Sequence, residues 1–134
     1  MPPALTICQP FAALIIAGEK RCENRKWRLN AERFPELLIH AGRNRVWLRE
    51  WDGPVPRPLH FGALLGSAEV VGVWHKRAID RGAIPAEFAW LREHPHCHGP
   101  WCIVFGRITV FDRPIPYSGR QGVFDVPAHV LRGE

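Results

Sequence analysis

The chain has 134 residues, of which 46% are apolar and 23% are charged. These values are typical of one globular domain with its own core, and they exclude a disordered chain. The longest apolar run, residues 11–17, is far shorter than the ~18 residues that a membrane span needs. The opening Met-Pro-Pro-Ala lacks the pattern of a signal peptide. We therefore expect one domain over residues 1–134, located in the cytoplasm.

Charge is distributed unevenly along this chain. Its 18 Lys and Arg residues exceed its 13 Asp and Glu residues, which gives a net charge of +5. Residues 20–49 contain nine basic and three acidic residues, a local net charge of +6, so the remainder is nearly neutral. Such a segment predicts a surface that meets phosphate, although a solvated basic face would have the same composition. The candidates for phosphate contacts are Arg25, Arg28, Arg43 and Arg45.

The predicted elements are mostly short strands. Residues 4–7 are predicted to form a strand, and Pro10 and Gly18 mark the start and the end of a predicted helix over 11–17. Gly66 and Gly72 predict bulges in the longest strand. Many strands with few helices predict an α+β fold, a small barrel of mixed short strands with helices around its mouth. The other predicted strands cover 21–27, 37–41, 62–74, 101–111, 114–117 and 122–126, and the other predicted helices cover 43–51 and 85–93.

The densest group of polar residues is 18–25, Gly-Glu-Lys-Arg-Cys-Glu-Asn-Arg. It lies where the first predicted helix gives way to a strand. Lys20 sits at that junction, so its long side chain can reach Glu23. A lysine and a carboxylate in one cleft can exchange protons or hold a polar ligand. The alternative is an exposed strand with ordinary ion pairs.

The spacing of Gly18, Lys20, Glu23 and Arg25 is G-x-K-x-x-E-x-R, which resembles the signature of the ASCH family, small β-barrel domains similar to the PUA fold. Other blocks resemble a bacterial, single-domain branch of that family, and they occur in the same order. The resemblance covers most of the chain and implies a PUA-like ASCH fold. The matching blocks are 6–12, 37–41, 62–69, 99–102, 114–117 and 122–127.

This resemblance implies a cleft that accepts RNA or a nucleobase. Family members are RNA-binding or coactivator-associated modules, single-strand ribonucleases, or small amidohydrolases that act on N4-acylated cytidines. The hydrolase branch uses the motif lysine, a threonine three residues later and a glutamate elsewhere. Lys20 matches the lysine, whereas Glu23 occupies the threonine position. The remaining carboxylate could be Glu69, Asp80 or Glu87, and Glu69 is favoured because it lies in a matching block.

The chemistry of Lys20 and Glu23 fits amide hydrolysis by another route. An acylated cytosine amide needs an activated water, a donor for the oxyanion and a proton for the leaving nitrogen. Glu23 can act as the base, and Lys20 as oxyanion donor and proton source, without a metal or another cofactor. The leading prediction is thus an amidohydrolase for N4-acylated cytosine nucleosides. The alternatives are a non-catalytic RNA-binding module, since the same pair can bind an unmodified base, and a single-strand ribonuclease.

Four residues are predicted to bind the substrate. Trp27 directly follows the motif and can stack on a base, a contact worth roughly 1–3 kcal/mol. Asn24 and Arg25 belong to the motif, and Tyr117 begins a polar turn that can form a second rim. The expected ligand is a nucleoside or single-stranded RNA. No membrane and no obligate protein partner is expected.

A second donor-rich segment raises the alternative of a metal site. Residues 94–102 contain three histidines and two cysteines, and zinc accepts several such sets of ligands. A short ribbon with two prolines is poorly suited to wrapping four ligands around one ion. We expect no metal here, and we expect all four cysteines of the chain to be free thiols.

Overall fold

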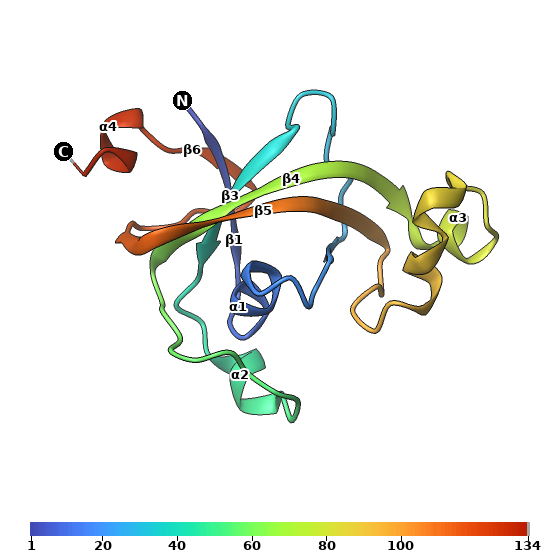
Figure 1. The fold of residues 1–134 in the computed structure, drawn as a ribbon, viewed down its shortest axis with the longest axis horizontal. Helices are drawn as coiled ribbons and strands as arrows, with labels where there is room; N and C mark the ends of the chain where they lie inside the picture. The colour runs from blue at the N-terminus through green and yellow to red at the C-terminus, as the bar shows by residue number, and fades with distance from the viewer. Residues whose placement is uncertain (134) are drawn as a thin grey trace.

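The computed structural model describes residues 1–133. Its six strands form one mixed sheet in the order β2-β5-β4-β3-β1-β6 (Figure 1). The predicted α+β class is confirmed, but the sheet does not close into a barrel, because β2 and β6 remain as its two edges. The strands are β1 (Pro3–Ile7), β2 (Cys22–Arg25), β3 (Glu36–Ala41), β4 (Ala63–His75), β5 (Trp101–Pro116) and β6 (Val123–Asp125).

Short helices occupy the connections between these strands. The predicted helices over 11–17 and 43–51 are present but shorter, and the one over 85–93 is a 3₁₀ helix. Two single-turn helices, α3 and α4, were not predicted. In residues 1–133 no helix is long and apolar enough to cross a membrane. The helices are α1 (Phe11–Ile16), α2 (Val46–Glu50), α3 (Lys76–Asp80), η1 (Ala86–Glu93) and α4 (Ala128–Leu131).

The two long strands, β4 and β5, form an antiparallel pair along most of their length. The predicted bulges are confirmed, since the register shifts between Leu64 and Gly66 and again between Val70 and Gly72. At Gly66 a Cβ atom would lie 2.1 Å from the carbonyl oxygen of Thr109, so only glycine fits this close approach. The strands predicted over 101–111 and 114–117 are one continuous strand, because β4 pairs with both parts.

The main core lies between the sheet and α1. Leu5, Ile39 and Phe105 on the sheet pack with Ala12 and Ile15 on α1, and all five are buried. Burial of such apolar surface stabilises the fold by roughly 25 cal/mol per Å². Because β1 leads into α1, this packing fixes both the end of β1 and the turn that follows α1.

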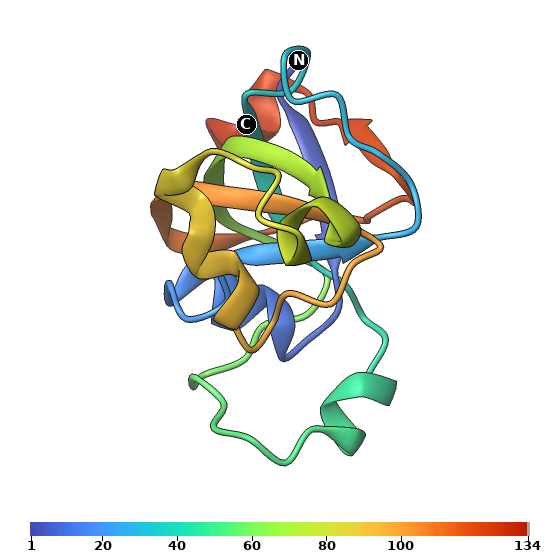
Figure 2. The same ribbon diagram turned by 90° about the vertical axis from the view of Figure 1, so that its right-hand side faces the viewer.

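A smaller core lies under α3 and η1, on the other side of β2 and β5. Its buried residues are Cys22, Ile79, Leu91, Cys97, Cys102 and Val104. Figure 2 shows α3 and η1 together in front of the sheet, whereas α2 projects away from it on a long loop. The second core holds the loop after η1 against β2, which is the strand that carries the motif.

Candidate functional site

The turn after α1 places Lys20. Leu14 accepts hydrogen bonds from the N–H groups of both Glu19 (3.0 Å) and Lys20 (3.1 Å). Gly18 allows the turn because its φ is +81°. The Lys20 side chain is only 4% exposed, and its Nζ lies 5.5 Å from the centre of the Phe11 ring. The ammonium group therefore points into the molecule and not into solvent.

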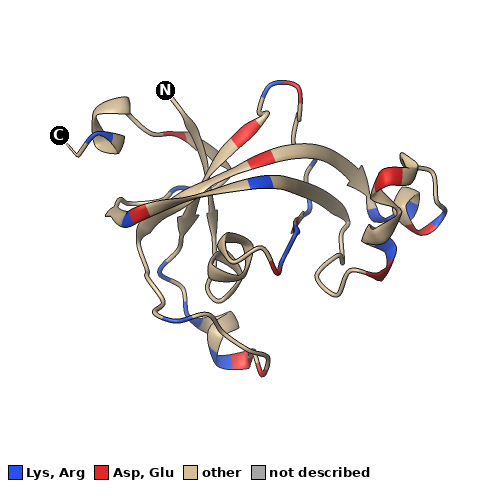
Figure 3. Cartoon of the chain, viewed as in Figure 1, with Lys and Arg blue, Asp and Glu red and all other residues tan. Residues whose placement is uncertain are grey.

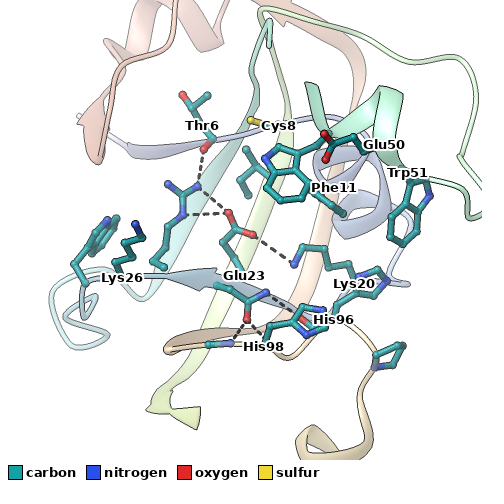
Figure 4. Close-up of a pocket in the computed structure, with 17 residues that line it drawn as sticks. Thr6, Cys8, Phe11, Lys20, Glu23, Lys26, Glu50, Trp51, His96 and His98 are labelled. Atoms are coloured by element: carbon teal, nitrogen blue, oxygen red, sulfur yellow. Dashed lines mark hydrogen bonds and ion pairs between the residues drawn. The ribbon is translucent and has the colours of Figure 1, made fainter. Parts of the chain in front are cut away.

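Strand β2 directs Glu23 toward this ammonium group (Figure 4). Arg25, two residues further along β2, lies on the same face and pairs with Glu23. Lys20 Nζ lies 3.4 Å from Glu23 Oε1. The other oxygen, Oε2, accepts hydrogen bonds from Arg25 Nε (3.1 Å) and Nη2 (2.8 Å). Arg25 Nη2 also donates to the carbonyl oxygen of Thr6 at 2.7 Å. The carboxylate is thus held between two cations, with Oε1 and Nζ side by side.

These groups line a pocket of about 800 Å³, which we call the motif pocket. Its lining comes from four separate parts of the chain, 6–11, 20–27, 47–51 and 95–99, and each part contributes an aromatic ring. Phe11 packs against Trp47 and Trp51, with ring centres 6.0 and 5.6 Å apart, and Trp51 stacks on His96 at 5.7 Å. A planar, partly apolar ligand with a polar edge fits such a pocket. The lining residues used below are Thr6, Cys8, Phe11, Lys20, Glu23, Asn24, Arg25, Trp27, Trp47, Glu50, Trp51, His96 and His98.

Trp27 lies in the lining of the motif pocket, and its side chain is 37% exposed. Trp47 and Trp51 were not predicted as site residues. They lie in and just after α2, whose sequence mixes them with charges. They reach the pocket only because the long segment between β3 and β4 folds so that these two rings pack against Phe11.

Asn24 lines the same pocket, but its side-chain hydrogen bonds go to the loop after η1. Its Nδ2 donates to the carbonyl of His96 at 2.8 Å, and its Oδ1 accepts from the N–H groups of His98 (2.9 Å) and Gly99 (2.8 Å). Asn24 therefore fastens the loop that supplies the His96 wall.

Two predicted site residues lie away from the motif pocket. Glu69 is on β4, where its Oε1 accepts the N–H of Arg107 at 3.2 Å, and it does not line the pocket. Tyr117 follows β5 and stacks its ring parallel to Phe124, and it does not line the pocket either. The second carboxylate at the pocket is Glu50, at the end of α2.

The basic segment is divided by the fold (Figure 3). Arg25 and Arg43 line a second pocket beside the first, described below. Arg28 lies 5.5 Å from the centre of the Trp101 ring, and Arg45 lies 3.8 Å from that of Phe61. Two of the four arginines predicted to meet phosphate therefore share one cavity, and the other two cover aromatic rings.

The donors of segment 94–102 do not converge on one point. Cys97 Sγ lies 3.3 Å from Cys102 Sγ inside the smaller core, whereas His94 Nε2 accepts the N–H of Arg21 at 3.0 Å. Among residues 1–133 there is no group of three His, Cys, Asp or Glu side chains placed to hold a metal ion. All four cysteines are free thiols, as predicted.

Burial sets the protonation of several groups around the site. It lowers the pKa of His94, and it lowers the pKa of His96 to about 4, an effect that the nearby charge of Lys20 increases. Burial also raises the pKa of Cys8, and the carboxylate of Glu23 adds to this rise. Both histidines are therefore neutral near pH 7, and Cys8 is a thiol and not a nucleophilic thiolate.

Comparison with known proteins agrees with this motif and fold. The family model described as the ASCH domain matches residues 5–104. The chain belongs to the ASCH domain family. ASCH domains are associated with RNA binding and with hydrolase-like activity.

Two solved structures of the ASCH protein from Zymomonas mobilis share the fold. One has 13% sequence identity and a TM-score of 0.59, and covers 98% of this chain and 91% of that chain. A single-substitution variant of that protein gives 14% identity and a TM-score of 0.58, with 98% and 92% covered. At this identity the likeness concerns the fold alone. No curated protein matches this chain.

Proposed function

We propose that this ASCH domain binds a cytosine-type base in the motif pocket and hydrolyses an acyl amide on its N4 nitrogen. The observation that carries the proposal is the pair of Lys20 Nζ and Glu23 Oε1, 3.4 Å apart and both largely buried, in an aromatic-walled pocket. Donor and acceptor stand side by side there, and flat apolar walls surround them. This combination suits the edge and the faces of a nucleobase.

Base recognition follows from the pattern of donors and acceptors. Cytosine offers a donor at N4, and acceptors at N3 and O2. The Glu23 carboxylate can accept from N4–H, as carboxylates do for cytosine in nucleic-acid recognition. The Lys20 ammonium group has three N–H donors, so one can stay with Glu23 while another reaches a neighbouring acceptor. Phe11, Trp47 and Trp51 are then available for stacking on the base.

The same pair can carry out the hydrolysis. Glu23 takes a proton from water, and the resulting hydroxide attacks the acyl carbon. Lys20 donates a hydrogen bond to the oxyanion that forms on the acyl oxygen. The bond from the acyl carbon to N4 then breaks, and the proton held by Glu23 passes to N4, which gives cytidine and a carboxylic acid that loses its proton to solvent. Arg25 keeps Glu23 in position through its two hydrogen bonds to Oε2.

A threonine nucleophile does not belong to this mechanism. Glu23 occupies the position at which the hydrolase branch has threonine. Thr6 also lines the pocket, but its hydroxyl donates to His40 Nδ1 at 3.0 Å, and Figure 4 shows that side chain directed away from the Lys20–Glu23 pair. Direct attack by water is therefore the route that the residues support.

The test is to incubate the purified protein with N4-acetylcytidine and to follow cytidine and acetate by chromatography. The proposal predicts release of both products in equal amounts, with catalytic turnover. Tight binding of cytidine without any release would contradict hydrolysis and would favour the second function, a non-catalytic RNA-binding module. That alternative is favoured by one observation: Arg43 and Arg120 line the pocket beside the motif pocket, and neither forms an ion pair within residues 1–133.

A further inference from the structure

A second cavity of about 690 Å³ adjoins the motif pocket, and we call it the arginine pocket. It shares Thr6, Arg25 and Trp27 with the motif pocket. Its remaining lining comes from the residues around Arg43, after β3, and from the loop 118–122, between β5 and β6. One ligand can therefore occupy both cavities across Arg25 and Trp27.

The arginine pocket carries positive charge, and of its three arginines only Arg25 has a carboxylate partner within residues 1–133. Arg25, Arg43 and Arg120 line it, and no Asp or Glu does among residues 1–133. Within the same range neither Arg43 nor Arg120 forms an ion pair. Arg25 donates from Nε and Nη2 to Glu23, and from Nη2 to the carbonyl of Thr6. Its Nη1 has no hydrogen-bond acceptor within residues 1–133. Guanidinium groups in this state match the oxygens of a phosphate.

A buried histidine holds the loop that carries Arg120. His40 is 2% exposed, and its Nε2–H donates to the carbonyl of Tyr117 at 2.6 Å. Burial lowers the pKa of His40, so its ring is neutral near pH 7, and because Nε2 carries the proton, Nδ1 accepts from the Thr6 hydroxyl. A Cβ atom at Gly119 would lie 2.4 Å from Thr6 Oγ1 and 2.5 Å from the His40 ring. The loop is thus packed tightly on this pair before any ligand binds.

We infer that the arginine pocket binds a phosphate group of the ligand whose base occupies the motif pocket. This inference rests on the proposed function and narrows it, because the preferred ligand is then a phosphorylated cytidine and not a free nucleoside. The phosphate can belong to a mononucleotide or to an RNA chain, and the chemistry of recognition is the same. Arg25 joins the two sites, since it lines both pockets and also holds Glu23.

The inference is tested by calorimetric titration at low salt with cytidine, its 5′- and 3′-monophosphates and inorganic phosphate. At least one monophosphate should bind about tenfold more tightly than cytidine, which one charge-assisted hydrogen bond can supply. Inorganic phosphate should compete with that monophosphate. Equal affinities for cytidine and for both monophosphates would overturn the inference.

Variants then assign the effect to the pocket. The double variant Arg43→Gln/Arg120→Gln should lose the gain from phosphate and keep its affinity for cytidine. Arg81→Gln removes one charge from an exposed arginine outside both pockets and should keep the gain. The variant Arg43→Lys/Arg120→Lys keeps the charge and should retain part of the gain in affinity from the phosphate. This result would show that the loss in the double Gln variant is not caused by misfolding. A gain that persists in the double Gln variant would overturn the inference.

Two further ligands separate the possible outcomes. If uridine monophosphate binds as tightly as cytidine monophosphate and cytidine does not bind, the proposed base site fails while the phosphate site stands. If cytidine binds and phosphate adds nothing, only the phosphate site fails. A short cytidine oligonucleotide identifies the source: tighter binding than the monophosphate, with a log–log salt slope of about −0.7 per phosphate, indicates an RNA chain.

Discussion

Two segments of this chain are rich in chemically active side chains, and the fold brings these side chains together in only one of the two segments. In residues 18–25 the turn after α1 and the strand β2 direct Lys20, Glu23 and Arg25 to one pocket, where they form a continuous chain of ion pairs. In residues 94–102 the two thiols enter a core, His94 bonds to the backbone of Arg21, and His96 and His98 line the motif pocket. A high density of such side chains along the sequence therefore does not by itself form a site. The fold must also bring their functional atoms together at one place.

The two segments nevertheless depend on each other. Asn24 bonds to the loop at His96, His98 and Gly99, and the N–H of Arg21 donates to His94. The second segment therefore supports the first, and it also contributes the His96 wall of the motif pocket.

The largest effect is expected when the carboxylate of the first segment loses its charge. Glu23→Gln cannot take a proton from water, so kcat for N4-acetylcytidine should fall by about 10²–10⁴-fold. Glu69→Gln is the matched control, because Glu69 lies outside the motif pocket. Steady-state assays of both variants would contradict the assignment if Glu69→Gln were the one to lose activity.

The link between the segments is tested by Asn24→Ala. Loss of its three hydrogen bonds to the loop should lower the free energy of unfolding by about 1–3 kcal/mol, as measured by urea denaturation. It should also lower kcat/KM, because the His96 wall is no longer fixed. Asn30→Ala, which removes an exposed side chain that bonds to Glu32 and Arg33 outside the pocket, should leave kcat/KM unchanged. Equal losses of kcat/KM in both variants would argue against the support role.

The histidines of the second segment should make the fold sensitive to acid. The folded state lowers the pKa of His94 and of His96 (to about 4), and it also lowers the pKa of His40. The unfolded chain binds these protons near pH 6.5, so stability is complete above that pH and is lost as the pH falls towards about 4. Denaturation curves across this range should show the decline.

The variant His96→Phe isolates one part of that acid effect. It keeps an aromatic ring beside Trp51 and removes one titrating group, so the decline in stability should become shallower. His129→Phe is a suitable control at the distant helix α4. An unchanged slope in His96→Phe would show that His96 does not bind its proton more weakly in the folded state.

The smallest effect is expected from chelation. A structural zinc held by residues 94–102 would contribute strongly to folding, so its removal would lower Tm markedly. We expect EDTA or a stronger zinc chelator to change neither Tm nor turnover. Elemental analysis with about one zinc per chain, together with a loss of either property, would contradict the finding that the donors of this segment do not converge on a metal ion.

The motif and the main strands could be predicted from the sequence because their signals are local. The helix signals at Pro10 and Gly18 and the spacing of Lys20 and Glu23 are read over a few residues. The position of Glu69 could not be predicted, because it depends on the register between β4 and its neighbours. The roles of Trp47 and Trp51 depend on a long loop that packs on Phe11, which no local pattern reveals.

The most direct test of the account compares two lysine variants in the hydrolysis of N4-acetylcytidine. Lys20→Met removes the buried ammonium group of the motif pocket, and Lys76→Met removes an ammonium group that pairs with Asp80 on α3. We predict that kcat falls by at least about 10²-fold in Lys20→Met, as for the loss of an oxyanion donor, and stays at the wild-type value in Lys76→Met. Wild-type turnover in a folded Lys20→Met protein would contradict the account.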